Sequence, residues 1–426
     1  MQVFKFGGAS VKDAAGVRNV AEIIRQHDNQ PTLVVVSAMD KITNALELLA
    51  NLATQRQRAQ AQAQLDHIRQ FHHQMIDELL PTQQAEVQAA IRVDLEELAE
   101  IVEGILLLRD FPDRVYDRIM AYGELISSTI LHRYLQQQGI PTHWVDSRSI
   151  IVTDDTYRSA RVLWGPTQAQ IDRQVRPWVR HHAVVVTQGF IGSSSDGHTT
   201  TLGREGSDYT ASIYGSCLDA QAVVIWKDVP GVMTGDPKTL PDAEILRKLS
   251  YEQAVEMTFY GASVIHPNTI KPLHNKGIPL YVRCFLDPQA AGTVISTFKP
   301  QEVDRKPTTI LKKNQLLLHL RPRDFSFMNE RMMSRIFHET RNFPIQINLV
   351  QSTAISLTLC VDHRTDTVQQ LVSNLSEQFL VEIEKDLILK TILNVDVRKI
   401  QSPIDARFVQ RDRNNIHLVV QAEDQV

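Results

Sequence analysis

The sequence predicts an α/β fold, a mainly parallel sheet sandwiched by helices, followed by a smaller α+β region of ferredoxin-like type. Three observations lead to this prediction. Short apolar runs alternate with helical stretches over most of the chain up to residue 300. One long helical block interrupts that alternation. Beyond residue 300 the order of elements changes to strand, helix, strand, strand, helix, strand, which is a βαββαβ unit.

The parallel sheet is predicted from short apolar runs with the length and composition of strands that are buried on both faces. These runs are Val3–Phe6, Thr32–Ser37, Ala183–Phe190, Ala222–Lys227 and Leu280–Phe285. Helical stretches separate them, as in a doubly wound sheet.

The helical block lies between the second and third strands. It spans Asn44–Leu108 and is rich in Gln, Ala, Leu and Glu, with Pro81 and Thr82 as its only interruption. Since proline ends or kinks a helix, we predict a helical hairpin at about residues 44–110. A further helix, Arg114–Gln138, follows it.

The C-terminal region is predicted from a change of pattern after a polar linker, Lys299–Pro307. The elements of the βαββαβ unit are Leu316–Leu320, Asn329–Glu339, Ile345–Val350, Ile355–Val361, Thr367–Gln378 and Leu380–Glu384. The strands that follow are Leu387–Leu393, Ala406–Gln410 and Asn415–Gln421, without clear helices between them. We therefore predict domains at residues 1–298 and 308–386 and a reduced second unit of the same kind at 387–426.

Composition disfavours several classes of function. The net charge is −4 and the basic residues are scattered, so we expect neither a nucleic acid nor a membrane as partner. Cys217, Cys284 and Cys360 lie far apart without a CxxC pair, which predicts reduced thiols and no metal-ligand set. No apolar run approaches the length of a transmembrane helix and no signal peptide is evident, so we expect a cytoplasmic protein.

The segment Thr199–Ser212 is too polar for a core and combines hydroxyl residues, glycines, an arginine and an aspartate. Small residues allow a backbone to approach a ligand, and N–H groups at a helix start bind anions. Arg204 offers a planar fork that suits a carboxylate or a phosphate. The alternative is a solvated loop in which Ser207 and Asp208 only cap a helix.

The first predicted strand delivers Lys5 to a turn that contains Gly7, Gly8 and Ser10. A lysine beside such a turn can place its ammonium where backbone N–H groups face a phosphate. The chain has neither a Gly-Lys dipeptide nor a Gly-x-Gly, so the P-loop and the dinucleotide fingerprint are both absent. A lysine that only lies along the edge of the sheet is the alternative.

Polar residues also follow other strands. Ser37 and Thr43 come after the second strand, where ligands of parallel sheets bind, although turn and capping chemistry would explain them equally well. Glu124 lies within a helix among small residues. The proline-rich turn Trp226–Lys238 after the fourth strand suits a loop that faces a nucleotide, but many turns look similar.

In combination, these motifs resemble those of the aspartate kinases in the amino acid kinase family, over about residues 1–297. The matching motifs are Lys5-Phe-Gly-Gly-Ala-Ser10, Ser37 with Ile42-Thr-Asn44, Gly123-Glu-Leu125, Gly189-Phe-Ile-Gly192, Thr199-Thr-Thr-Leu-Gly-Arg-Glu-Gly-Ser-Asp208, Lys227-Asp-Val-Pro-Gly231 and Tyr260-Gly-Ala-Ser-Val-Ile-His-Pro267. The C-terminal pattern looks like the ACT domains that aspartate kinases carry.

The resemblance implies ATP-dependent phosphorylation of the aspartate β-carboxylate to 4-phospho-L-aspartate, the first step of lysine, threonine and methionine biosynthesis, with Mg²⁺. It implies Lys5 and Asp208 as catalytic residues. The implied substrate residues are Ser37, Thr43, Glu124, Arg204 and Ser207. The implied nucleotide residues are Lys5, Gly7, Gly8, Ser10, Lys227, Asp228, Met233, Lys238 and Ser263.

Three positions depart from the pattern of the family. Ala9 replaces a usual threonine, and Glu205 replaces a usual glycine and is expected to point outward. Ser263 stands where many relatives carry a lysine that contacts the nucleotide. Its presence either weakens ATP binding or is offset by Lys227 or Lys238. The ACT-like region leaves room for an amino-acid effector without identifying it, and the resemblance implies a homodimer or a higher homo-oligomer.

Two other functions compete with this interpretation. One is another amino acid kinase, acting on glutamate, acetylglutamate or a nucleotide, which the Gly203–Asp208 string and the ACT-like region disfavour. The other is an amino-acid sensor without catalysis. Ser263 favours the sensor, whereas the retained residues of the motifs argue against it, namely Lys5, Glu124, Arg204 and Asp208.

Overall fold

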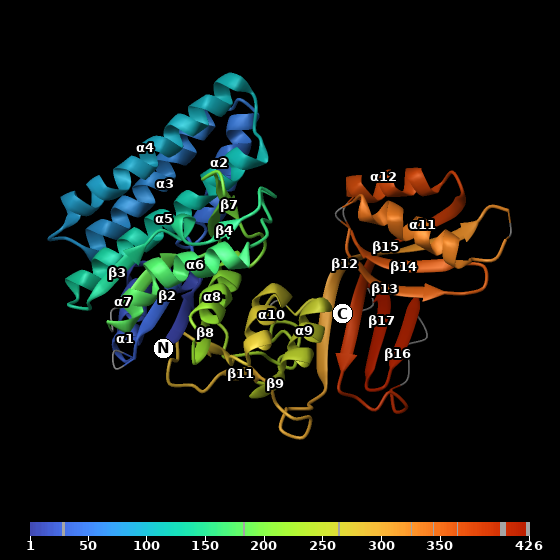
Figure 1. Ribbon diagram of the computed structural model, residues 1–426. Coiled ribbons are helices and arrows are strands. Elements are labelled where there is room, and N and C mark those ends of the chain that lie inside the picture. The colour runs from blue at the N-terminus through green and yellow to red at the C-terminus, as the bar shows by residue number, and fades with distance from the viewer. Residues whose placement is uncertain are drawn as a thin grey trace. The chain divides into compact units, whose positions relative to one another are not determined.

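A computed structural model describes residues 1–27, 30–181, 184–262, 265–324, 326–343, 345–363, 365–400 and 406–422. The chain divides into two compact units (Figure 1). The first consists of Met1–Val232, Ile245–Val255 and Val264–Asp304. The second consists of Met233–Glu244, Glu256–Ser263 and Arg305–Val426.

The first unit is built on an eight-stranded sheet with the order β3-β5-β2-β1-β8-β10-β11-β9. Its strands are β1 (Gln2–Phe6), β2 (Thr32–Val36), β3 (Thr142–Val145), β5 (Val184–Gln188), β8 (Ala222–Lys227), β9 (Lys248–Ser250), β10 (Leu280–Cys284) and β11 (Thr293–Ser296). The six from β3 to β10 run parallel, and β11 is antiparallel to β10. All five predicted strands are present, with ends shifted by at most two residues, which confirms the α/β prediction for this unit.

A smaller sheet orders the polar segment that the sequence singles out. It contains β4 (Val152–Thr153), β6 (Ile191–Ser194) and β7 (Thr199–Thr201), in the order β4-β6-β7. The hairpin of β6 and β7 leads directly into the turn before helix α8 (Gly206–Cys217). The segment Thr199–Ser212 is therefore a strand, a turn and the first half of a helix.

Helices cover the large sheet on both faces (Figure 1). The helices up to β10 are α1 (Ala14–Arg25), α2 (Ile42–Thr54), α3 (Arg58–Leu79), α4 (Gln84–Leu108), which packs on other helices, α5 (Asp113–Gln137), α6 (Trp164–Gln174), α7 (Arg176–Arg180), α8, α9 (Tyr251–Phe259), whose residues divide between the two units, and α10 (Pro267–Lys276). In the described part of the chain, none is long and apolar enough to cross a membrane.

The predicted helical hairpin is only partly right, because the block contains three helices rather than two. The break at Pro81 is present between α3 and α4, but a second break separates α2 from α3. Arg56 adopts a left-handed conformation there, with φ of 63°. No proline or glycine marks this turn, so the local sequence gave no stop signal.

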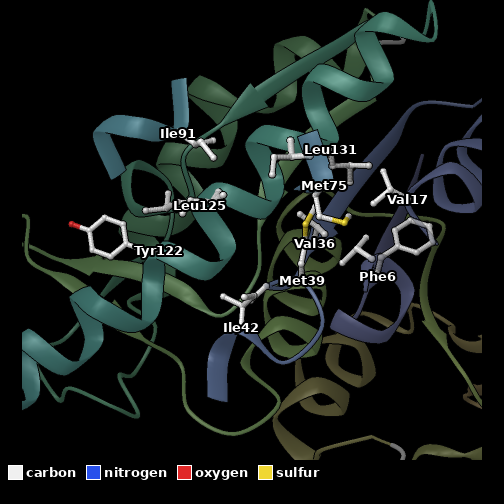
Figure 2. Close-up of a cluster of buried hydrophobic side chains, with 14 of the residues drawn as sticks. Phe6, Val17, Val36, Met39, Ile42, Met75, Ile91, Tyr122, Leu125 and Leu131 are labelled. Carbon is white, nitrogen blue, oxygen red and sulfur yellow. The ribbon is translucent and has the colours of Figure 1, made fainter. Parts of the chain in front are cut away.

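The core of the first unit joins the sheet to these helices. Figure 2 shows Phe6 and Val36 of the sheet close to Met75 of α3, with Leu125 and Leu131 of α5 in the same cluster. All five side chains are buried. Helix α5 is thereby fixed against both the sheet and the helical block, which holds its polar residues in place.

The second unit is a six-stranded antiparallel sheet with the order β13-β14-β12-β15-β17-β16. Its elements are β12 (Thr308–Pro322), α11 (Glu330–Arg341), β13 (Ile347–Ser352), β14 (Leu357–Asp362), α12 (Thr365–Leu375), β15 (Phe379–Leu393), β16 (Phe408–Asp412) and β17 (Asn415–Gln421). The predicted βαββαβ order is confirmed.

Two strands of this sheet are much longer than predicted. The predicted runs at Leu380 and Leu387 are parts of one strand, β15, and the first predicted strand extends back to Thr308 as β12. These strands pair along their whole length, with register shifts near Lys312 and Gln315. The shifts accommodate polar residues without ending the strand, so the expected boundary at residue 386 lies within a continuous strand.

Two segments from the middle of the chain pack within the second unit. Thr309 donates a backbone hydrogen bond to the carbonyl of Thr234, 2.8 Å away. Asn415 donates to the carboxylate of Glu256 at 2.7 Å. The ring of Tyr260 lies 4.3 Å from that of His417. Residues 233–244 and 256–262 therefore pack within the second unit, although they precede β12 in the sequence.

Candidate active site

Three charged residues meet at the carboxyl ends of neighbouring parallel strands. Lys5 comes from β1 and Lys227 from the end of β8, which pairs with β1. Asp208 comes from the first turn of α8. The Lys5 ammonium lies 2.7 Å from one carboxylate oxygen of Asp208, and the Lys227 ammonium lies 3.3 Å from the other. One buried carboxylate thus holds two ammonium groups side by side.

The charge state of Asp208 follows from this arrangement. Its side chain is buried, and burial alone would raise the pKa of the carboxyl group. The two ammonium groups outweigh burial and hold the pKa below its ordinary value. Asp208 is therefore ionised at neutral pH, and the cluster carries one net positive charge.

Close backbone contacts shape the floor of the site. A Cβ atom on Gly8 would lie 2.7 Å from the carbonyl oxygen of Asp40 and 2.9 Å from that of Ala38. A Cβ atom on Gly189 would lie 2.5 Å from the Cβ of Ser207. Both glycines are needed because backbone or short side-chain atoms leave no room. Gly8 lets the turn after β1 approach the turn after β2, and Gly189 lets the end of β5 approach the start of α8.

Glu124 is a buried carboxylate on α5 that faces the same site. A Cβ on the preceding Gly123 would lie 2.7 Å from the Cβ of Ala38, so this glycine allows α5 to approach the end of β2. Glu124 is 3% exposed, and its Oε2 atom has no hydrogen-bond partner. Burial raises the pKa of Glu124 to about 8. Burial thus outweighs the nearby charge of Lys5, and the side chain has no ion pair among the described residues.

These groups line one cavity of about 560 Å³. It is lined by Lys5, Ser37, Thr43, Tyr116, Glu124, Arg158, Phe190, Thr201, Gly203, Arg204, Glu205, Gly206, Ser207, Asp208 and Lys227. The cavity is large enough for a small amino acid and the terminal phosphate of a nucleotide. Its lining carries charges of both signs.

The cavity brings together eight of the residues that the sequence singles out. They are Lys5, Ser37, Thr43, Glu124, Arg204, Ser207, Asp208 and Lys227. No described acidic residue forms an ion pair with Arg204, so its guanidinium is available to a ligand.

The other candidates lie elsewhere. Gly7 and Gly8 form the turn beside Lys5 without lining the cavity, and Asp228 is exposed just beyond it. Ser10 is buried, its hydroxyl has no hydrogen-bond partner, and it is not among the residues that line the cavity. The segment that carries Met233 and Lys238 belongs to the second unit. Ser263 lies outside the described residues.

The expectation for Glu205 is wrong. Its side chain does not point outward but lines the cavity, with Oε2 buried and without a hydrogen-bond partner. Its backbone is left-handed, with φ of 53°, at the residue that precedes α8. A glycine would adopt this conformation without strain. The turn keeps the shape that suits glycine while the side chain adds a carboxylate to the site.

The sequence reasoning missed Tyr116, Arg158, Phe190 and Thr201. Phe190 and Thr201 lie within motifs already quoted, so position in the motif was an available signal. Tyr116 and Arg158 lie outside every motif, and their place in the cavity depends on the tertiary fold.

A buried aspartate joins these parts of the wall. Asp117 on α5 is fully buried. It accepts hydrogen bonds from the backbone N–H of Arg158 at 3.0 and 2.9 Å. It also accepts from the N–H and hydroxyl of Thr201, both at 2.8 Å. One carboxylate thus ties α5 to β7 and to the loop before α6.

No group of three or more His, Cys, Asp or Glu side chains in the described ranges could hold a metal ion. Asp208 is the buried carboxylate closest to the two lysines, and both of its oxygens already face ammonium groups. This donor set does not form a protein cage. It fits an ion such as Mg²⁺ that keeps its waters and is bound mainly by nucleotide phosphates.

Comparison with known proteins agrees with this geometry. The model of the amino acid kinase family matches residues 1–284. The lysine-sensitive aspartokinase 3 of Escherichia coli is 31% identical over 408 residues, which cover 93% of this chain and 88% of the relative. The chain belongs to the amino acid kinase family, among the aspartokinases. Aspartokinase 1 of Arabidopsis thaliana, a chloroplastic protein, is 28% identical over 90% of the chain and 67% of its own length.

Solved aspartokinase structures extend the similarity to the whole chain. E. coli aspartokinase III in complex with aspartate and ADP, the R-state, matches with a TM-score of 0.86 at 29% identity. The same enzyme in complex with lysine and aspartate, the T-state, matches with a TM-score of 0.81. Each match covers 100% of this chain and 97% of the other. The second unit thus corresponds to the C-terminal region of these aspartokinases.

Proposed function

We propose that the chain transfers the γ-phosphoryl group of ATP to the side-chain carboxylate of L-aspartate. The observation that carries this proposal is the pairing of two unlike subsites in one cavity. One subsite is the Lys5–Asp208–Lys227 cluster, with two ammonium groups suited to phosphate oxygens. The other is the buried, unpartnered carboxylate of Glu124 with the free guanidinium of Arg204, suited to an amino acid.

The reaction needs no general base. The side-chain carboxylate of aspartate is ionised at neutral pH, because its pKa is about 3.9, and it is itself the nucleophile. The difficulty is to bring two anions together, so catalysis depends on position and electrostatic stabilisation. Lys5 and Lys227 neutralise the phosphate oxygens as charge shifts from the γ-phosphate towards the leaving diphosphate. Asp208 holds both ammonium groups in place.

The acceptor amino acid is bound by charges of opposite sign. Its ammonium pairs with Glu124, which supplies the cation that the buried carboxylate lacks. Arg204 binds the α-carboxylate through its planar fork. Ser37, Thr43 and Ser207 complete this subsite with hydroxyl groups after β2, at the start of α2 and at the start of α8.

Mg²⁺ would enter with the nucleotide, where it would offset phosphate charge. Asp208 is the cavity residue that could approach it, through a water or through an oxygen released from a lysine. From the resemblance to aspartate kinases alone, we also propose as nucleotide-binding residues Gly7, Gly8, Ser10, Asp228, Met233, Lys238 and Ser263. We further propose that the second unit binds an amino-acid effector and that the chain forms a homo-oligomer.

The decisive experiment is an ATP-dependent hydroxamate assay with purified protein. Hydroxylamine traps the acyl phosphate, and we expect product with L-aspartate and at least tenfold less with L-glutamate, since one methylene changes binding by about 1–3 kcal/mol. Product with glutamate alone would assign the chain to another acceptor. No product with either acid, while aspartate still binds, would identify a sensor without catalysis.

A further inference from the structure

Arg158 is a charged residue of the cavity that no motif accounts for. It lies in the loop between β4 and α6 and lines the same cavity as Glu124 and Arg204. Its carbonyl oxygen would lie 3.3 Å from a Cβ on Gly203, the residue before Arg204. Two arginines therefore reach the acceptor side of the cavity from adjacent backbones.

The backbone of Arg158 is held in an unfavourable conformation. Its φ is 64°, in the left-handed region, which costs a side-chain-bearing residue about 1–2 kcal/mol. Both oxygens of the buried Asp117 accept from its N–H. Two residues later, the N–H of Ala160 donates to the carbonyl of Thr201 at 2.8 Å. Residues in rare conformations that their surroundings fix in this way concentrate at ligand sites.

The side chain of Arg158 is also fixed in direction. Its guanidinium lies over the ring of Tyr116, 3.9 Å from the centroid, and its Nε donates to Asp113 at 2.5 Å. Tyr116 lines the cavity as well, and its hydroxyl reaches Glu47 at 3.4 Å. The ring and Asp113 hold one face and one edge of the guanidinium, and no hydrogen bond from its terminal nitrogens is present in the described part of the chain.

The charges that line the cavity indicate what those nitrogens bind. Lys5 and Lys227 share the single carboxylate of Asp208 and so keep one net positive charge for phosphate oxygens. Glu205, next to Arg204 in the sequence, also lines the cavity, and its Oε2 atom has no hydrogen-bond partner. On the acceptor side, Arg158 presents its terminal nitrogens and Arg204 has no ion-pair partner among the described residues, while Glu124 can pair with an ammonium that a ligand brings. An amino dicarboxylic acid offers two carboxylates and one ammonium.

We propose that Arg158 is a second substrate-binding arginine, which contacts a carboxylate of the acceptor and acts with Arg204 to select amino acids that carry two carboxylates. The inference rests on the proposed function, because it concerns the acceptor of that reaction. Arg158 acts in binding rather than in the transfer itself. Its loss weakens acceptor binding and leaves the phosphate subsite unchanged.

The test compares Arg158→Gly, Arg158→Lys and the wild type in steady-state assays. Glycine removes the guanidinium and adopts the left-handed conformation without strain, so the fold is preserved. We expect the KM for aspartate to rise about tenfold or more in Arg158→Gly, since a hydrogen bond to a charged group is lost. We expect kcat within twofold of wild type and an unchanged KM for ATP. Arg158→Lys should fall between the two.

Two further measurements separate substrate contact from structural support. Asp113→Asn removes the ion pair of Arg158 but keeps the guanidinium, so the KM for aspartate should stay the same or fall. Competition by L-asparagine and L-isoasparagine, which each lack one carboxylate charge, should show which group Arg158 binds. The affinity for one of these two analogues should be insensitive to Arg158→Gly, whereas the affinity for aspartate is not.

An unchanged KM for aspartate in Arg158→Gly would overturn the inference while leaving the proposed function intact. An equal loss of affinity for aspartate and for both analogues would also overturn it, because it would indicate a general disturbance of the loop. Failure of the wild type to phosphorylate aspartate at all is a different result, and it would overturn the proposed function.

Discussion

The two sides of the cavity treat their charges in opposite ways. On the phosphate side, Lys5 and Lys227 both lie within ion-pair distance of the buried Asp208, so each charge has a partner inside the protein. On the acceptor side, Glu124 is equally buried but has an oxygen without a partner, and its pKa is raised to about 8. The ion pairs of the phosphate side form within the protein, whereas Glu124 on the acceptor side gains an ionic partner only from a ligand.

This difference teaches how the site divides its work. Paired charges in the interior keep a fixed geometry, which suits groups that must stabilise a transition state without rearranging. A buried carboxyl group with a raised pKa costs free energy to ionise unless a cation approaches it. This cost selects for amino acids as ligands, because only a ligand that brings an ammonium to Glu124 offsets it. Substitution of Lys5 on the paired side is expected to have a larger effect than substitution of Glu124 on the unpaired side.

The largest effect is expected from Lys5→Met. It removes the ammonium nearest to Asp208 and should lower kcat by about 10³-fold, the scale observed when one electrostatic donor is removed from an active site. Lys12→Met, an exposed lysine just after the same turn, is the matched control and should be silent. Because Asp208 would keep only Lys227, circular dichroism and aspartate binding must show that the fold survives. A kcat within tenfold of wild type in a folded variant would remove Lys5 from the mechanism.

The next effect concerns Glu124→Gln. It should raise the KM for aspartate by about 10- to 100-fold, since a charge-assisted contact with the substrate ammonium is lost, and should leave the KM for ATP unchanged. Equal changes in both KM values would instead point to a general distortion of the cavity.

The same substitution should stabilise the fold at alkaline pH. The pKa of Glu124 is about 8 in the folded chain, against an ordinary value of 4.5. Ionisation therefore favours the unfolded state, and wild-type stability falls as the pH rises from 4.5 to about 8 and levels off above that. The advantage of Glu124→Gln in melting temperature should be small at pH 5 and larger at pH 8. An advantage that does not change with pH would contradict the raised pKa.

A smaller effect is expected from pH alone. Below pH 8 the free enzyme holds Glu124 protonated, and the bound substrate ammonium requires the ionised form, so binding releases a proton. The KM for aspartate should fall as the pH rises from 6 to 8, by up to about tenfold per pH unit. In Glu124→Gln this slope should disappear. Calorimetry in buffers of different ionisation enthalpy would count the released proton directly.

The smallest effect on catalysis is expected at Gly7 and Gly8, the two glycines beside Lys5, which should respond differently to a methyl group. A methyl group on Gly8 would meet backbone carbonyls at 2.7 and 2.9 Å, whereas one on Gly7 would meet only the end of the Lys5 side chain at 3.1 Å. Gly8→Ala should cost about 1–3 kcal/mol of stability, as overpacking does. Gly7→Ala should leave the melting temperature nearly unchanged and lower kcat a few-fold by shifting Lys5. Urea titration and steady-state kinetics measure the two outcomes.

The residues of the phosphate side can be predicted from the sequence more fully than those of the acceptor side, and the reason is physical. Lys5 and Lys227 follow apolar strands, and the carboxyl ends of parallel strands meet at one edge of a sheet. Arg158 follows no such rule, because its place depends on hydrogen bonds to Asp117, 41 residues earlier in the chain. The left-handed backbone of Arg158 is fixed by that tertiary contact, so no local sequence pattern predicts its place in the cavity.

The same limit explains the errors in the fold. The break after α2 occurs at Arg56, where neither proline nor glycine marks a turn. Strand β12 is 15 residues long because it pairs with β15 on both sides of a register shift between Lys312 and Gln315, a polar stretch that the sequence alone predicts as loop. Glu205 is expected to point outward because its negative charge lies beside a predicted anion site, yet its side chain lines the cavity. In each case a tertiary contact outweighed a local preference.

The packing of residues 233–244 and 256–262 within the second unit bears on how such a protein can be divided or recombined. A chain cut after residue 298 would keep both segments but lose the strands that hold Thr234, Glu256 and Tyr260. Exchange of the C-terminal region between relatives would require compensating changes at these positions. The two units are separate in structure, but each is built from more than one stretch of the sequence. Neither unit can therefore be exchanged as one continuous segment.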